Sequence, residues 1–182
     1  MRELSLHILD AFENSRVAEA TLIQLEITED MEKDRLEIAI TDNGRGMTPD
    51  FAARVFDPFV TSRTCRKVGL GLPLLKAAAQ RCNGDAEISS APGKGTTLHA
   101  FFQHSHIDRA PLGNLVESLV IFLAANPEMD LIYTHRVNEK AFTLDTRELR
   151  VELEDVPLNS PPVLDWIRKY LREELQEINS TA

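Results

Sequence analysis

The spacing of apolar residues changes abruptly near residue 20, and this change constrains the fold more than any other feature of the chain. Residues 4–20 carry apolar side chains at intervals of three or four, with no Gly or Pro, which predicts a helix. From residue 22 the interval becomes two, first over residues 22–28 and again, after an acidic turn at residues 30–34, over residues 36–41. This alternation predicts an antiparallel hairpin with one core face and one polar face.

The rest of the first 104 residues adds both kinds of element. Residues 42–50 contain two glycines and a proline and predict a loop, and helices are predicted over 49–55 and 72–81. Strands are predicted over 86–90 and 96–103. The order is therefore helix, two strands, two helices, two strands. It predicts an α+β fold, a two-layer α/β sandwich in which helices cover one face of an antiparallel or mixed sheet.

Residues 105–182 differ from the first 104 residues in sequence pattern, and we expect them to form a small α+β C-terminal extension to a domain of residues 1–104. Helices are predicted over 111–125 and 161–178, with strands near 130–137 and 140–145 and a further possible strand near 148–153. The last helix has one apolar stripe. This stripe suits packing on the chain's own sheet or pairing of two chains as a homodimer.

Composition narrows the class of protein. The formal net charge of −9 at pH 7 argues against nucleic acid or an anionic membrane as a general partner. The apolar runs fall far short of the roughly 20 residues that a membrane span needs. Cys65 and Cys82 have no metal-binding spacing and fit a reducing compartment. We therefore expect a cytoplasmic protein with no membrane partner and no nucleic-acid partner.

Glycines mark a candidate ligand site within this acidic chain. Three pairs stand at junctions between predicted elements: Gly44 and Gly46, Gly69 and Gly71, Gly93 and Gly95. Glycine lets the backbone approach a ligand closely, and N–H groups at a helix start suit phosphate. Residues 54–81 contain six basic residues and one acidic residue, against the sign of the whole chain. Together these features predict binding of a polyanion such as a nucleotide triphosphate.

The first predicted helix carries Asp10 and Asn14, which are four residues apart and share one face. A carboxylate and an amide oxygen suit Mg²⁺, which prefers oxygen ligands and keeps several waters. The alternative for this pair is an ordinary solvated helix face.

In order along the chain, these motifs resemble the N, G1, F, G2 and G3 boxes of the GHKL (Bergerat-fold) ATPases. They are most similar to the catalytic ATP-binding domain of bacterial sensor histidine kinases. The matching segments are DAFENS at 10–15, DNGRG at 42–46, FDPF at 56–59, GLGL at 69–72 and GKGT at 93–96. The resemblance covers residues 4–103 and not residues 105–182. It implies the Bergerat fold and binding of ATP with Mg²⁺.

The resemblance also implies a role for each matching residue. Asn14 would bind Mg²⁺, Asp42 would accept a hydrogen bond from the adenine amino group, and Thr96 would lie near the adenine edge. The other implied nucleotide contacts are Gly44, Gly46, Met47, Phe59, Arg63, Gly69, Leu70, Gly71 and Leu72, with residues 57–68 as an ATP lid. Asp10 stands where hydrolytic members carry a general-base Glu, and it is one methylene shorter, which predicts slow hydrolysis or none.

The resemblance implies a function in signalling. A sensor kinase has a dimerising helical hairpin with a phosphoacceptor histidine ahead of its ATP domain, whereas here the N box begins almost at residue 1. We expect a stand-alone histidine-kinase-type protein that phosphorylates a protein partner, such as a response regulator, or regulates it with ATP. Two alternatives stay open: a nucleotide-gated binding module similar to the anti-sigma kinases, and a weak ATPase. We read His7 as a packed or half-exposed residue of the first helix. For His104 and His106, at the end of a predicted strand, a metal or phosphoacceptor role is an alternative, and His135 is an alternative phosphoacceptor.

Overall fold

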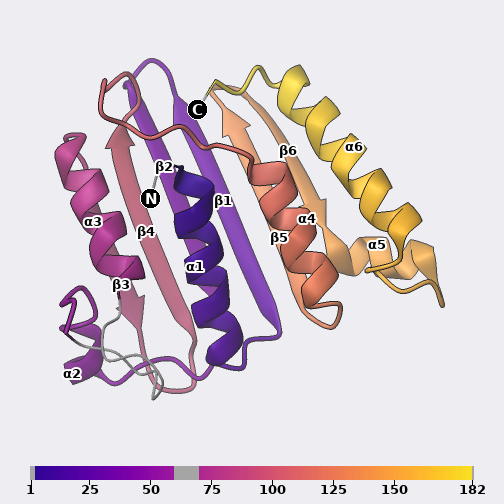
Figure 1. Cartoon of the computed structure of the whole chain (residues 1–182), viewed down its shortest axis with the longest axis horizontal. Coiled ribbons are helices and arrows are strands. Elements are labelled where there is room, and N and C mark those ends of the chain that lie inside the picture. Colours follow the sequence, from indigo (N-terminus) through magenta and orange to yellow (C-terminus); the bar gives the residue numbers. More distant parts are fainter. Residues whose placement is uncertain (1–2, 60–69, 182) are drawn as a thin grey trace.

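A computed structural model of the chain describes residues 3–59 and 70–181 (Figure 1). These residues form six helices and six strands. Their bounds are α1 Leu4–Val17, β1 Leu22–Asp30, β2 Arg35–Asp42, α2 Pro49–Ala52, α3 Gly71–Arg81, β3 Asp85–Ser90, β4 Thr96–Gln103, α4 Leu115–Ala125, β5 Asp130–Val137, β6 Lys140–Asp145, α5 Thr146–Leu153 and α6 Pro161–Glu177.

All six strands belong to one mixed sheet, in the order β3-β4-β2-β1-β5-β6. The predicted hairpin is present, with β1 antiparallel to β2. The β1–β5 pair is parallel, whereas the β2–β4, β3–β4 and β5–β6 pairs are antiparallel. Because β5 pairs directly with β1, the sheet runs without a break from the first hundred residues into the C-terminal segment.

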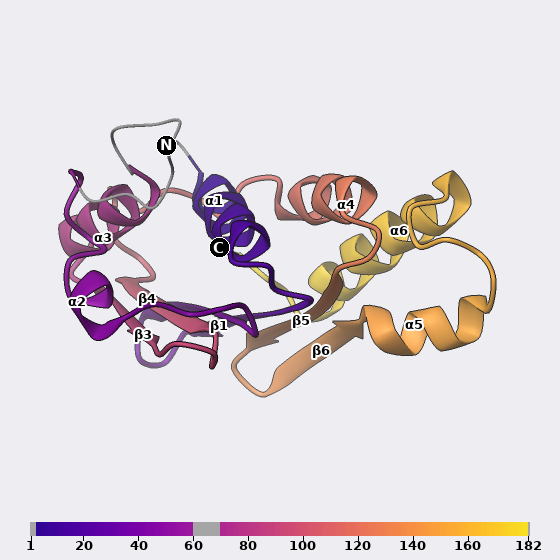
Figure 2. The ribbon, with the colours of Figure 1, turned by 90° about the horizontal axis from the view of Figure 1, so that it is seen from below.

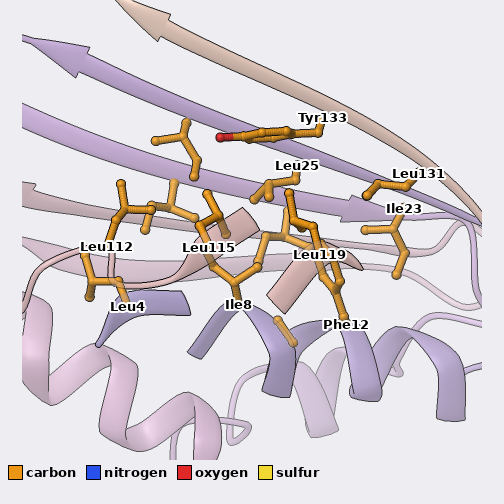
Figure 3. Packing of buried hydrophobic residues seen from close by; sticks show 14 of the residues in the cluster. Leu4, Ile8, Phe12, Ile23, Leu25, Leu112, Leu115, Leu119, Leu131 and Tyr133 are labelled. Carbon is orange, nitrogen blue, oxygen red and sulfur yellow. The ribbon is translucent and has the colours of Figure 1, made fainter. Parts of the chain in front are cut away.

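The helices α1, α3 and α4 lie on one face of this sheet (Figure 2). The alternation seen in the sequence explains the burial, because Ile23, Leu25 and Ile27 of β1 point into the core while Glu26 is exposed. Helix α1 contributes Leu4, Ile8 and Phe12 to the same core, beside Leu115 and Leu119 of α4 (Figure 3). The Phe12 and Phe122 rings meet edge to face at 4.8 Å, which ties α1 to α4.

The structure corrects several boundaries. The possible strand near 148–153 is wrong, because residues 146–153 form α5. Asp145 caps this helix by accepting the Arg147 N–H, and Leu149 and Leu153 pack on the core at helical spacing. The helix predicted from 111 begins at Leu115, since Gly113 has a φ of +75° and Asn114 provides the cap. Helix α2 ends at Ala52 rather than Val55, and α1 ends at Val17 rather than residue 20.

The apolar stripe of the last helix packs on the chain itself. Val163, Ile167 and Leu171 of α6 are buried in the same core cluster as the residues of α1 and β1. Glu117 of α4 joins α6 through ion pairs to Arg168 and Arg172 at 2.9 and 2.8 Å. The structure therefore shows the packing within the chain that was expected of this stripe, and pairing of two chains stays a prediction.

Candidate functional site

A cavity of about 550 Å³ opens beside α1, where the first helix faces α2, the start of α3 and the ends of β2 and β4. This volume is within the range of small-molecule sites, about 300–1,000 Å³. Its lining combines polar groups with apolar side chains from three strands and three helices. The lining residues are Asp10, Ala11, Asn14, Ser15, Val17, Ala18, Ile40, Asp42, Arg45, Gly46, Met47, Thr48, Phe51, Val55, Leu70, Gly71, Leu72, Pro73, Leu74, Ile88, Thr96 and Leu98.

Asp42 is the last residue of β2, and both oxygens of its carboxylate are held by the protein. The Ser15 hydroxyl donates to Oδ2 at 2.8 Å, and the Gly44 N–H donates to Oδ1 at 2.9 Å. An ionised carboxylate offers about four acceptor positions, so two of them remain for a ligand. A fixed acceptor therefore faces the cavity.

The loop after β2 is held close to the last turn of α1. The Arg45 N–H donates to the Ala18 carbonyl at 2.9 Å, and a Cβ at Gly44 would lie 2.8 Å from that carbonyl oxygen. Gly46 has a φ of +67°, and a Cβ there would collide with the Ala91 carbonyl. These two positions need glycine for close approach and for backbone conformation, so they shape the wall that also presents Asp42.

Asp10 and Asn14 of α1 share the cavity with the first residues of α3. Gly71 starts α3, and a Cβ there would lie 3.1 Å from Asp10 Oδ2, so the absence of a side chain lets the two helices meet. Asp10 thus brings a carboxylate to the place where α3 begins, and Asn14 lines the same cavity. This arrangement combines ligands that Mg²⁺ accepts with a helix start that attracts phosphate.

His7 lies one turn before Asp10 and is also part of the α1–α3 contact. Burial lowers its pKa to about 4, against a weaker opposing effect of a hydrogen bond with the Gly71 backbone. The neutral imidazole is therefore the form that packs in the core. Our sequence-based view of His7 as a packed helix residue agrees with this position.

Nine of the thirteen residues predicted from the sequence line the cavity: Asp10, Asn14, Asp42, Gly46, Met47, Leu70, Gly71, Leu72 and Thr96. Gly44 is buried beside Ala18 and Asp42 and is not part of the lining. Phe59 is 83% exposed and does not belong to the lining. Arg63 and Gly69 lie outside the described residues, as does Cys65. The structure brings most of the predicted set together, while the role of each residue stays a prediction.

Sequence reasoning did not select Ser15, nor the apolar wall made by Ile40, Ile88 and Leu98. A signal for Ser15 was present, because it is a polar residue that continues the buried row of Ile8, Ala11 and Phe12 on α1. Thr96 joins the site through Ser90, whose hydroxyl lies 2.9 Å from Thr96 Oγ1 and accepts the Met47 N–H at 2.9 Å. The strand end and the glycine loop are thus coupled by one serine.

A second polar cluster, centred on Glu29, lies at the other end of the β1–β2 hairpin and is buried. His135 Nε2 and His104 Nε2 lie 2.8 and 3.0 Å from the Glu29 carboxylate, and Ser180 and the Thr181 backbone N–H also donate to it. Burial of Glu29 favours its neutral form, but the hydrogen bonds prevail and hold its pKa at about 2. Over residues 3–59 and 70–181 the structure has no group of three His, Cys, Asp or Glu placed to hold a metal.

The cavity has the size of a small-molecule site, and comparison with known proteins gives the family. Residues 1–106 match the histidine kinase-, DNA gyrase B- and HSP90-like ATPases, and the chain belongs to this family. It also resembles sensor histidine kinase YxdK of Bacillus subtilis, with 34% identity over 83 residues that cover 43% of this chain and 26% of that protein.

Two further relatives each match part of the chain. SenX3 of Mycobacterium tuberculosis, a sensor-like histidine kinase, is 36% identical over 85 residues, or 42% of this chain and 21% of SenX3. The non-motile and phage-resistance protein of Caulobacter vibrioides is 29% identical over 115 residues, or 60% of this chain and 14% of that protein. The matches therefore span at most 26% of the length of these three relatives.

Solved structures confirm the α+β Bergerat fold. The N-terminal domain of a DNA repair protein superposes with a TM-score of 0.53 at 16% identity, covering 80% of this chain and 53% of that chain. The MutL ATPase domain of Aquifex aeolicus, solved with ADP, superposes with a TM-score of 0.50 at 16% identity, covering 80% and 63%. Among the described residues, each helix is too short or too polar to cross a membrane.

Proposed function

We propose that this protein binds Mg·ATP in the cavity beside α1 and uses the nucleotide to phosphorylate or regulate a protein partner in signalling. The observation that carries the proposal is Asp42, a carboxylate fixed on both oxygens that lines the cavity and keeps acceptor capacity. Such a group can accept a hydrogen bond from an exocyclic amino group. The sequence relatives that are sensor histidine kinases favour signalling as the setting.

The residues of the cavity fit the nucleotide and its metal. Ile40, Ile88 and Leu98 offer an apolar wall to a base, beside Asp42. Asn14 would hold Mg²⁺ through its amide oxygen, and the backbone at the start of α3 would meet the phosphates. Bound Mg·ATP would supply a phosphoryl group whose charge the metal neutralises. The chain's own contribution is to orient the base and to position the phosphates.

Calorimetry with Asp42→Asn tests the binding site. The introduced amide presents a donor toward the adenine amino group, so we expect ATP affinity to fall by about tenfold to a hundredfold, as for a lost charge-assisted hydrogen bond with a repelling group in its place. Glu26→Gln is the matched control, because Glu26 is exposed on the outward face of β1. Equal ATP affinity for wild type and Asp42→Asn would remove Asp42 from the site.

Phosphotransfer is tested separately with labelled ATP and candidate partner proteins. Label on a partner that disappears with Asp42→Asn would support the kinase activity. If ATP changes the affinity of this protein for a partner and no label is transferred to that partner, the result would support regulation by nucleotide-dependent binding instead of phosphotransfer. A partner that is neither labelled nor bound differently with ATP is not a target.

A second candidate is weak ATP hydrolysis, and the position of Asp10 favours it. This carboxylate lines the cavity with Asn14 and lies beside Gly71 at the start of α3. Steady-state phosphate release that Asp10→Asn abolishes would support hydrolysis with Asp10 as general base. Release at an equal rate in the two proteins would assign it to another residue or to a contaminant.

A further inference from the structure

Ser15 is a buried residue in the last turn of α1, only 3% exposed, and its hydroxyl has two acceptors within reach. Asp42 Oδ2 lies 2.8 Å away and the Ala11 carbonyl 3.2 Å away. A serine hydroxyl has one proton to donate. The shorter, charge-assisted bond to the carboxylate is the stronger of the two, so the proton of Ser15 is directed at Asp42.

The bond from Ser15 has a consequence for the orientation of the carboxylate. The terminal torsion of an aspartate side chain is soft, with broad energy wells. The Gly44 N–H holds Oδ1 and the Ser15 hydroxyl holds Oδ2, so together they fix the plane of the group. With the Gly44 bond alone, the carboxylate could turn about that one contact. Ser15 therefore determines where the remaining acceptor positions of Asp42 point.

We propose that Ser15 is a positioning residue for base recognition: it orients the Asp42 carboxylate so that the site selects nucleotides with an amino group at position 6 of the purine. This inference rests on the proposed function, because it assumes that Asp42 receives the adenine amino group. Preorganised acceptors bind more tightly because less freedom is lost on binding. Ser15 thus contributes to selectivity through Asp42.

The test compares two nucleotides that differ in one group. ATP carries the 6-amino group, whereas purine riboside 5′-triphosphate has hydrogen in its place and gives Asp42 nothing to accept. We expect Ser15→Ala to weaken ATP binding by about fivefold to tenfold, the range of one hydrogen bond to a charged group. Binding of purine riboside triphosphate should change by less than about twofold, because that ligand does not use the oriented carboxylate.

Three further variants keep the test independent of folding. Ser15→Thr retains the hydroxyl and should restore ATP selectivity. Ser15→Cys keeps a similar volume with a weaker donor and should fall between Ser15→Ala and wild type. Ser118→Ala removes another buried helical serine, on α4 away from the cavity, and should bind both nucleotides like wild type. Circular dichroism and melting temperature establish that each variant is folded.

The outcomes separate this inference from the proposed function. A wild-type protein that binds ATP no more tightly than purine riboside triphosphate would overturn recognition by Asp42, and the role of Ser15 with it. A wild type that prefers ATP, with Ser15→Ala and Ser15→Cys retaining the full preference, would overturn the role of Ser15 alone. Equal weakening of both nucleotides by Ser15→Ala would also overturn it, since a purely structural role predicts that result.

Discussion

Asp42 and Glu29 are carboxylates at opposite ends of the β1–β2 hairpin, and they differ in how much of their hydrogen-bonding capacity the protein uses. Asp42 is paired with Ile23, six residues along β1 from Glu29, a separation of roughly 20 Å at the usual rise per residue of a strand. Asp42 accepts from Ser15 and Gly44 and lines a cavity. Glu29 is fully buried and is contacted by five donor groups of four residues.

The difference indicates how to distinguish a binding carboxylate from a structural one. A carboxylate has about four acceptor positions. In Glu29 they are taken by His135, His104, Ser180 and the Thr181 N–H, with none left for a ligand. In Asp42 the protein's bonds orient the group and leave acceptors open. We therefore expect changes at Glu29 to act on stability and changes at Asp42 to act on nucleotide affinity.

The largest effect should come from Glu29→Ala, which leaves two buried imidazoles and the tail donors without their acceptor. Removing one partner from a buried charged network costs about 3–5 kcal/mol, so the free energy of unfolding in urea should fall by that amount. Glu26→Ala, on the outward face of the same strand, should stay within about 0.5 kcal/mol of wild type. A loss below about 1 kcal/mol for Glu29→Ala would contradict the structural role.

Lowering the pH should reduce the free energy of unfolding by an amount similar to the loss in Glu29→Ala. The pKa of Glu29 in the folded protein is about 2, below its ordinary value of 4.5, so its contribution to stability is present above pH 4.5 and is lost as the pH falls toward 2. The shift corresponds to about 3 kcal/mol. His7, with its pKa lowered from 6.5 to about 4, adds a loss between pH 6.5 and pH 4, because the unfolded chain takes up that proton first.

Urea unfolding at closely spaced pH values separates the two windows. Glu29→Gln should remove the pH dependence of the free energy of unfolding below pH 4.5 and keep the loss between pH 6.5 and pH 4. His7→Leu should remove the loss between pH 6.5 and pH 4 and keep the one below pH 4.5. The two windows overlap near pH 4 to 4.5, so the variants are needed to assign them. A wild-type profile that is flat from pH 7 to pH 3 would be inconsistent with both pKa shifts.

The sequence predicted the sheet and most of the cavity, because the motifs that form the cavity lie at element junctions that periodicity also marks. It missed the Glu29 cluster, although the pattern contained it. Glu29 continues the inward row of Ile23, Leu25 and Ile27, and His135 continues that of Leu131 and Tyr133. A charged or polar residue on an inward row predicts a buried partner. Which partner it meets depends on the parallel β1–β5 pairing.

That pairing could not be derived from local pattern. Alternation predicts a strand near 130–137, but it does not say whether the strand joins the first sheet or a separate one. The strand predicted at 148–153 was wrong because local pattern was again too weak. This short segment has few apolar residues, and its helical period becomes clear only from the packing of Leu149 and Leu153 on one face. The cap at Asp145 was the available signal for a helix.

A smaller effect is expected from the tail that closes over Glu29. Ser180 Oγ donates to Glu29 Oε1 at 2.5 Å, so Ser180→Ala removes one of several donors to the carboxylate. Because the histidines remain, we expect a loss of about 1 kcal/mol in the free energy of unfolding. Ser89→Ala, at an exposed position of β3, is the control. A loss for Ser180→Ala as large as for Glu29→Ala would mean that the tail, and not the network, holds this end together.

The smallest effect on stability should come from Asp42→Asn, the same substitution that should weaken ATP binding most. The amide oxygen can still accept the Gly44 N–H, and the amide NH₂ can donate to Ser15 Oγ. Ser15 then turns its own proton to the Ala11 carbonyl, 3.2 Å away, so each bond of the cluster has a replacement. The free energy of unfolding without nucleotide should therefore change by less than about 0.5 kcal/mol. A loss of 2 kcal/mol or more, on the order of an unsatisfied buried polar group, would make Asp42 a structural carboxylate like Glu29.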